Sequence, residues 1–263
     1  MKFFLLHLFT IFCFGNITFA DEPENFLITS NQASIIGQRL NDYENGKLDL
    51  QYFGEKAGID VWRELIGYYL LHTNNISTKA KLPVARCYAQ FHLIAQATEL
   101  GEEYVNVYSN DWRGWRLLGY CYDITDSPDK AILAYSNSAR LGPKLGYEQL
   151  AGCAMRNNRW DVVKNIVPQL LALKKAGEMP KEDRFSLITI LIGYSLKTDR
   201  EDIFIETLEG ENVSEIAEND SIRQDITTGC GVFQGPEIDK IRKELELATR
   251  GSLGSTATNT LPP

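Results

Sequence analysis

The chain has 263 residues, of which 44% are hydrophobic and 24% are charged, a composition typical of a globular protein rather than a disordered or fibrous one. A formal net charge of −8 argues against a nucleic-acid-binding protein, which needs a basic surface for its phosphate contacts. With only three histidines and five cysteines, a zinc site with several ligands or a histidine-based catalytic triad is hard to assemble. The composition therefore disfavours DNA-binding proteins and metalloenzymes without indicating a function.

Residues 1–20 have the pattern of a secretory signal peptide. Lys2 precedes an almost wholly apolar run from Phe3 to Phe14, and small residues at Thr18 and Ala20 lead into an acidic stretch. We therefore expect cleavage after Ala20 and export to the periplasm or the extracellular space. No later segment reaches the roughly 18 consecutive apolar residues of a membrane span, so we expect no transmembrane segment after cleavage.

Helical periodicity dominates the rest of the chain. Apolar residues recur at spacings of three and four, and no alternating β-hairpin pattern appears. The pattern predicts an all-α fold with helices at residues 30–41, 47–56, 61–72, 80–99, 111–124, 128–141, 144–157, 159–175, 181–197, 199–209 and 236–249.

Several residues are typical of helix ends. Asp60 and Asp199 are placed to cap the helices that follow them, and Gly177 is placed to end the helix before it. Pro236 suits the first turn of the last helix, where its missing N–H costs nothing.

The strongest pattern spans residues 115–143. Its seven residues are Trp115, Leu118, Gly119, Tyr122, Ala131, Tyr135 and Pro143. Their spacing resembles the tetratricopeptide repeat, a helix pair with the pattern W-x2-L-G-x2-Y…A-x3-F…P over 34 residues. Two small residues lie where the helices of the pair cross closely, and the proline ends the second helix. The resemblance implies an α-α superhelix, a solenoid of antiparallel helix pairs similar to that family.

Neighbouring repeats match less well. Downstream, Leu150 keeps a core position and Trp160 stands near the start of a second helix. Upstream, Trp62-x2-Leu65-x3-Tyr69 resembles a first helix but begins 53 residues before Trp115, which is not one period. We therefore expect a longer hairpin over 61–99, or an irregular piece near residues 100–110.

The resemblance also suggests a division of the mature chain. Repeat-like structure is expected over residues 61–209, with the best match at 112–175. Residues 21–60 are expected to be an N-terminal arm with capping helices, and residues 210–249 a C-terminal capping region and helix. Residues 250–263 lack a periodic apolar face and are expected to be a disordered tail.

The cysteines of the mature chain suggest structural thiols. Cys121 and Cys153 occupy a small, buried position of successive repeats, where the α-carbons are about 10 Å or more apart. A disulfide needs α-carbons within about 7 Å, so we expect no bridge between them. The state of Cys87 stays open. Cys230 is expected in a flexible loop, where a reactive or paired thiol is conceivable.

Candidate chemistry is sparse, and no catalytic residue, metal site or cofactor is predicted. Residues 201–220 hold eight acidic residues and no basic one, which suggests a solvated face more than a calcium site, since no D-x-D-x-D-G loop is present. His72 and His92 have no orienting partner that the sequence suggests. Asn75, Asn212 and Asn219 begin glycosylation sequons, which matter only in a eukaryotic source.

The family resemblance implies partner binding along the first helix of each pair. The groove positions fall on Arg113, Arg116, Tyr120, Asp123, Glu148, Met155 and Arg156. Arginine and tyrosine are favoured at binding hot spots, although Arg113 and Arg116 could equally be solvated charges. Family members that bind a C-terminal carboxylate use an asparagine where Tyr120 stands, so that kind of clamp is not expected.

These observations favour an exported, non-catalytic scaffold that binds a protein or peptide partner through its concave groove. Two alternatives remain open: a carbohydrate-active hydrolase that uses paired carboxylates on a helical scaffold, and a structural component of the cell envelope.

Overall fold

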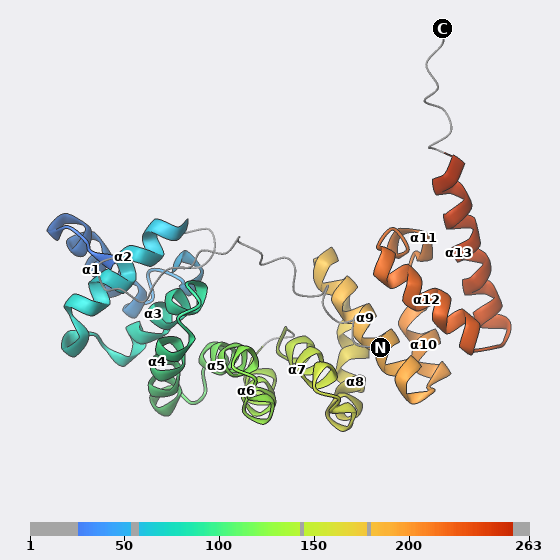
Figure 1. Cartoon of the computed structure of the whole chain (residues 1–263), viewed down its shortest axis with the longest axis horizontal. Coiled ribbons are helices and arrows are strands. Elements are labelled where there is room, and N and C mark those ends of the chain that lie inside the picture. Colours follow the sequence, from blue (N-terminus) through green and yellow to red (C-terminus); the bar gives the residue numbers. More distant parts are fainter. Residues whose placement is uncertain (1–25, 54–57, 143–144, 178–179, 255–263) are drawn as a thin grey trace, which may run out of the picture. The chain divides into compact units, whose positions relative to one another are not determined.

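The computed structural model describes residues 26–53, 58–142, 145–177 and 180–254. Within these ranges all regular elements are helices, and no strand is present (Figure 1). The expectation of an all-α fold is therefore confirmed. The chain forms two compact units, residues 1–153 and 154–263.

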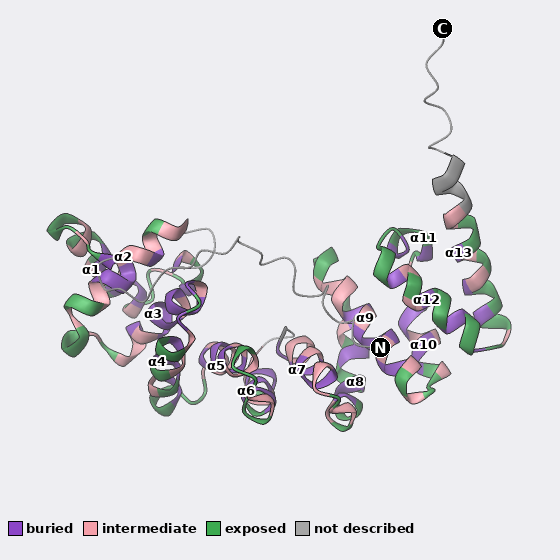
Figure 2. Cartoon of the chain, in the orientation of Figure 1, coloured by how far each residue is buried: buried purple, intermediate pink, exposed green. Residues whose placement is uncertain are grey.

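The first unit holds the helices that carry the repeat pattern. In chain order its elements are α1 (Ser30–Glu44), η3 (Leu50–Phe53), α2 (Gly58–Leu71), η5 (Thr73–Asn75), α3 (Thr78–Gln90), α4 (Ile94–Val107), α5 (Trp112–Ile124), α6 (Pro128–Leu141) and most of α7 (Leu145–Arg156). Helix α3 packs against α4, α4 against α5, and α5 against α6. Buried residues run along one side of these helices and exposed residues along another (Figure 2).

A regular 34-residue period relates two of these helix pairs. Thr78 and Trp112 begin α3 and α5 and are 34 positions apart, and the same separation holds between Ile94 of α4 and Pro128 of α6. The repeat before Trp115 is therefore α3 with α4. This corrects both the expected single helix over residues 80–99 and the irregular piece expected near residues 100–110.

The helix pairs are closed by the same kind of turn. The turn after each of α3, α5, α7 and α9 contains one residue with a left-handed backbone, with φ between 52° and 59°. These residues are His92, Asp126, Asn158 and Asp199. The amide that follows each of them donates to the carbonyl five residues earlier, over 2.8–2.9 Å. This bond satisfies a carbonyl at the helix end and reverses the chain, so the second helix begins two residues after the left-handed residue.

The close crossing of α5 and α6 explains the small residue in the motif. A Cβ at Gly119 would lie only 2.5 Å from the ring of Tyr135, so the tyrosine fills the space that the glycine leaves. Leu118 and Ala131 are buried beside it. Gly101 of α4 corresponds to Tyr135 and lies against Leu118 instead. Gly101 therefore permits close approach of α5 to α4.

The outer motif residues make polar contacts at the edge of this packing. The indole of Trp115 donates to the carbonyl of Ser109 over 2.8 Å, and the hydroxyl of Tyr122 donates to Glu102 over 2.6 Å. Leu150 of α7 is buried. Pro143 lies outside the described residues.

The first elements cover one end of the repeats. Phe26 is buried and contacts the ring of Phe91 edge-on, with ring centroids 5.5 Å apart. A helix was expected over residues 47–56; of these the structure describes 47–53, which contain the short 3-10 helix η3 and no α-helix. Its Leu50 and Phe53 enter the core of the first unit.

The second unit contains α8 (Trp160–Ala176), α9 (Lys181–Thr198), α10 (Glu201–Leu208), α11 (Val213–Ile216), α12 (Asp220–Val232) and α13 (Pro236–Gly254). Helix α12 was not expected. Cys230 lies buried within it and not in a flexible loop, which corrects that expectation. Gly229 of α12 permits close packing against Phe204 of α10, because a Cβ at position 229 would lie 2.2 Å from the phenylalanine ring.

The predicted helix ends have mixed outcomes. Gly177 ends α8 in the left-handed conformation and Pro236 begins α13, as expected. Asp60 lies in the first turn of α2, not before it. Asp199 was expected to cap α10. It instead ends α9, where it has a left-handed φ of 54°. Helix α13 extends through residues 250–254, where a tail was expected.

The Gly119 crossing gives a direct test of the repeat packing. Replacing Gly119 with alanine forces the Tyr135 ring to move, and we expect a loss of about 1–3 kcal/mol in unfolding free energy. Gly231 provides the matched control, since it is also helical and nothing lies within 4 Å of a Cβ placed there. Gly231→Ala should raise stability by up to about 1 kcal/mol through helix propensity. Urea unfolding followed by circular dichroism measures both, and equal effects would contradict the crossing.

Candidate functional site on the repeat helices

The expected partner-binding residues lie at three places in the chain. Four of them share α5 and are half-buried: Arg113, Arg116, Tyr120 and Asp123. They are spaced by three or four residues, so they lie along one side of the helix. Glu148 lies on the part of α7 that belongs to the first unit, whereas Met155 and Arg156 belong to the second unit.

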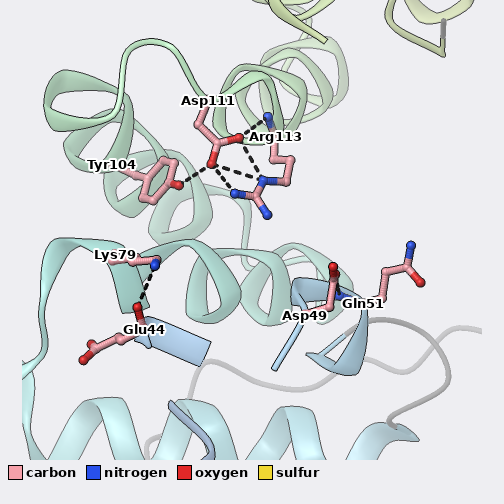
Figure 3. Close-up of polar contacts among 7 residues, drawn as sticks. All are labelled: Glu44, Asp49, Gln51, Lys79, Tyr104, Asp111 and Arg113. Atoms are coloured by element: carbon pink, nitrogen blue, oxygen red, sulfur yellow. Dashed lines mark hydrogen bonds and ion pairs between the residues drawn. The ribbon is translucent and has the colours of Figure 1, made fainter. Parts of the chain in front are cut away.

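Arg113 is held by an acid at the start of its own helix. Asp111 caps α5 and accepts the Arg113 amide over 3.0 Å, its Nε over 2.8 Å and its Nη2 over 2.6 Å (Figure 3). The hydroxyl of Tyr104, from α4, donates to the same carboxylate over 2.5 Å. Four donors on one carboxylate fix the guanidinium in place, so Arg113 has a structural role in joining α4 to α5.

The electrostatics of this cluster agree with its geometry. Burial raises the pKa of Asp111, but hydrogen bonds from Arg113 and Tyr104 outweigh burial, and the pKa is lowered overall. The hydrogen bond to Asp111 raises the pKa of Arg113. Burial and the bond to Asp111 raise the pKa of Tyr104. The acid is therefore ionised at neutral pH and paired with a permanent cation.

The end of α1 lies close to the same helices. Lys79 of α3, which corresponds to Arg113 by the 34-residue period, donates to the Glu44 carbonyl over 2.6 Å (Figure 3). Ser77, the cap of α3, donates to the carboxylate of Glu44. The Lys79 ammonium lies 5.8 Å from the centre of the Tyr43 ring. Equivalent positions of the two repeats thus both contribute to holding neighbouring elements together.

Tyr43, near the end of α1, lies beside Lys79. Its side chain is buried, and burial raises its pKa to about 12, while Arg113 and Asp111 act on it with opposite sign. Its hydroxyl has no hydrogen-bond partner among the described residues. Tyr43 is buried together with Leu50 and Phe53, and their elements α1 and η3 pack against α3.

Arg116 and Tyr120 form the open part of the α5 face. Neither has an ion pair or side-chain hydrogen bond within the described ranges, and both are half-buried; the ring of Tyr120 packs against the core of the first unit. Burial raises the pKa of Tyr120, which therefore stays protonated and can donate. One turn further on, Asp123 accepts from the Cys153 thiol over 3.6 Å.

The remaining expected residues are less accessible or already engaged. Met155 is only 9% exposed, and its methyl group lies 2.9 Å from a Cβ placed at Gly193 of α9. This burial differs from the exposed position that partner binding requires. Glu148 and Arg156 are half-buried and each interacts with another part of the chain.

The cysteines of the described residues are free thiols in buried positions. Cys87, Cys121, Cys153 and Cys230 form no disulfide, which agrees with the expectation for Cys121 and Cys153. Burial raises the pKa of Cys121 to about 11 and also raises that of Cys87 and Cys230. The thiols of Cys87, Cys121 and Cys230 are therefore protonated at neutral pH and act as small apolar side chains.

The acidic stretch 201–220 is partly buried and paired. Glu211, whose side chain is 2% exposed, lies 3.5 Å from the ammonium of Lys174 and 2.7 Å from the guanidinium of Arg184. Lys174 also donates to the carbonyls of Glu206, over 3.0 Å, and Glu209. Burial lowers the pKa of Lys174, and Glu211 opposes that shift. The expectation of a solvated acidic face is corrected at Glu211, whose basic partners come from α8 and α9. Five acids of the stretch are exposed, as expected: Asp202, Glu209, Glu215, Glu218 and Asp220.

Some kinds of site are absent from the part of the chain that the structure describes. There, no group of three or more His, Cys, Asp or Glu side chains is arranged to hold a metal ion. In the same ranges, no helix is both long and apolar enough to cross a membrane.

Several residues of this site were missed from sequence: Tyr43, Lys79, Tyr104 and Asp111. The 34-residue period could have indicated Lys79 and Asp111. Asp111 is a helix cap 34 residues after the cap Ser77, and Lys79 is a first-turn cation 34 residues before Arg113. Nothing local indicates Tyr43 or Tyr104, whose roles depend on contacts between helices.

Comparison with known proteins gives structural similarities alone, of which two are described here. No family model and no curated protein matches the chain. A structure described as a Podosopora anserina kinesin light chain with nearly identical TPR-like repeats is 13% identical, covers 80% of this chain and 98% of its own, and has a TM-score of 0.46. The MamA protein is 14% identical, covers 89% of this chain and all of its own, and has a TM-score of 0.39.

The class of the protein follows from its own geometry. Helix pairs that repeat after 34 residues, share one turn and cross at a small residue define an all-α protein with TPR-like helix pairs.

The Asp111 cluster predicts a stability change in acid. Because the folded pKa of Asp111 is lowered, its charge stabilises the fold above about pH 4, the ordinary pKa of aspartate, and this contribution is lost as pH falls through the folded pKa. Asp111→Asn keeps a capping side chain but removes the charge, so unfolding free energy should depend less on pH between about 4 and 2. Asp126→Asn, at an exposed left-handed position, is the control and should follow the wild type.

The Glu211 cluster predicts a large loss of stability. Glu211→Gln leaves the Lys174 and Arg184 cations without their buried counter-charge, and we expect unfolding free energy to fall by about 3–5 kcal/mol. Glu218→Gln, in the same acidic stretch but exposed, should change it by less than about 0.5 kcal/mol. Chemical denaturation of both variants gives the comparison, and a Glu211 variant as stable as the Glu218 one would mean that the cluster contributes nothing.

Proposed function

We propose that this protein is an exported, non-catalytic scaffold that binds a protein or peptide partner through the open part of the α5 face. Export rests on the leader-like residues 1–20, with cleavage near Ala20. A mature chain that begins at Asp21 retains all residues that the structure describes.

The observation that carries the proposal is the contrast between two arginines on one helix. Arg113 is bound by Asp111 through its backbone and its side chain, whereas Arg116, less than one turn later, has no ion pair in the described ranges. Tyr120 lies one turn beyond Arg116 and also has an unpaired polar end there. Arginine and tyrosine with packed stems and free polar ends are the residue types that dominate binding hot spots.

The proposed binding residues are therefore fewer than the sequence suggested. Arg116 and Tyr120 form the centre, with Asp123 on the same side of α5. Arg113 positions α5 and does not contact the partner. Met155 contributes to the core of the second unit and is left out of the site.

Charge reversal at Arg116 tests the binding face. Arg116→Glu should lower partner retention at least about tenfold, because a hot-spot residue contributes about 2 kcal/mol or more, and should leave the helical circular dichroism unchanged. The partner pool is the envelope and secreted fraction of the source cells, captured on the immobilised mature chain and quantified by mass spectrometry.

Two matched variants make this result specific. Arg140→Glu reverses an exposed arginine on α6 and should retain the partner. Arg113→Glu should lower the thermal midpoint because it faces Asp111 with a like charge. Proteins retained by the Arg140 variant but lost with the Arg116 variant are the candidate partners. Identical retention by both would refute the proposed face.

A further inference from the structure

A cavity lies between the last two helices of the second unit. Helices α12 and α13 lie against each other (Figure 1), and the cavity that they line has a volume of about 370 Å³. That volume is at the lower end of the range for small-molecule sites, and most of the lining is apolar. The lining comes from both helices: Thr227, Cys230 and Gly231 of α12, and Leu245, Glu246 and Thr249 of α13.

Packing within the chain does not explain the glycine in this lining. Gly229 of the same helix receives the ring of Phe204, but a Cβ at Gly231 would meet no other atom of the described residues within 4 Å. The backbone of Gly231 is helical, and a glycine inside a helix is less favourable than alanine. The chain therefore loses stability at a position where it leaves space open. Such a glycine suits a site where a ligand approaches the backbone closely.

The inner part of the cavity is apolar. Cys230 and Leu245 line it and are only 5% and 7% exposed. Thr227 and Thr249 donate their hydroxyl protons to carbonyl oxygens of their own helices, over 2.8 and 2.9 Å. Because these protons are already used, the lining favours a hydrocarbon chain or ring over a polar group.

The two charged residues of the lining differ in whether they are already paired. Arg242 donates to the carbonyl oxygen of Cys230 over 2.6 Å and to the carboxylate of Asp239. Glu246, one turn after Arg242, is exposed, and its carboxylate has no ion pair or hydrogen bond within the described ranges. The chain as a whole has a net charge of −8. A cation is therefore the charged group that this lining is placed to pair with.

We propose that the cavity binds a small organic cation with an apolar body, of the alkylammonium class. The apolar body contacts Gly231 and Leu245, and the ammonium group pairs with the carboxylate of Glu246. This inference goes beyond the proposed scaffold function. It uses the second unit and no residue of the α5 face, so either proposal can fail while the other holds.

Three straight-chain probes of equal length test the class of ligand. Hexylammonium, hexanol and hexanoate are titrated into the isotope-labelled chain from Asp21 to Pro263, and the amide signals are followed by NMR. We expect saturable shifts confined to α12 and α13. Hexylammonium should bind about threefold more tightly than hexanol, with hexanoate the weakest, because an exposed ion pair contributes modestly. High salt should reduce the advantage of hexylammonium, since it screens that pair.

Two substitutions with matched controls locate the site. Gly231→Leu fills the cavity and should weaken hexylammonium binding at least about tenfold, because the leucine takes the space of the apolar body. Leucine also favours a helix, so this variant should be at least as stable as the unsubstituted chain, and lost binding would not reflect unfolding. Val232→Leu changes the next residue, which is 55% exposed outside the cavity, and should bind normally.

The role of the carboxylate is tested separately. Glu246→Gln should remove the preference for hexylammonium over hexanol, whereas Glu237→Gln, at an exposed acid in the first turn of α13, should keep it. Tighter binding of hexanoate than of hexylammonium, or no saturable shift with any probe, would overturn the proposal. Binding that appears only after residues 255–263 are removed would assign the cavity to that segment of the chain. Shifts that grow with protein concentration alone would assign it to a second copy, and both results likewise overturn the proposal.

Discussion

The left-handed turn residue is the constraint on which the helix pairs depend. His92, Asp126, Asn158 and Asp199 each adopt a backbone conformation that is costly for a residue with a Cβ, and each is followed by an amide that satisfies a carbonyl at the end of the preceding helix. Aspartate and asparagine tolerate this conformation better than most residues. Because the turn has one geometry, the second helix of each pair starts at a fixed place, and the packing of Gly119 against Tyr135 is a consequence of that start.

The arrangement of charges follows from the same packing. Asp111 can bind both Arg113 and Tyr104 because α5 begins beside the end of α4. Glu211 can bind Lys174 and Arg184 because the segment after α10 returns to α8 and α9. In both clusters a largely buried carboxylate joins helices. Arg116 and Tyr120 of α5 have no such pairing within the described ranges, and the proposed function rests on that contrast.

The sequence predicted the pair α5–α6 well because its motif residues are also its packing residues. It failed at Phe91-His92-Leu93, because no glycine or proline marks that turn and two of its three residues are buried. It failed at α12 for the opposite reason: two glycines suggested a loop, although Gly229 is there to receive the ring of Phe204. The role of Arg113 could not be predicted from its position on a helix face, since it depends on Asp111 and on Tyr104 from another helix.

The exact 34-residue register of α3–α4 and α5–α6 has a consequence for how such a chain can change length. A segment of that length, cut within equivalent turns, carries a complete helix pair together with its turn residue and its cap, as Ser77 and Asp111 do for α3 and α5. Duplication of such a segment would add a pair whose faces coincide with those of its neighbours. An insertion of one or two residues inside a helix would instead rotate all later side chains out of register by about 100° each. The fold therefore tolerates growth by whole modules more readily than small insertions.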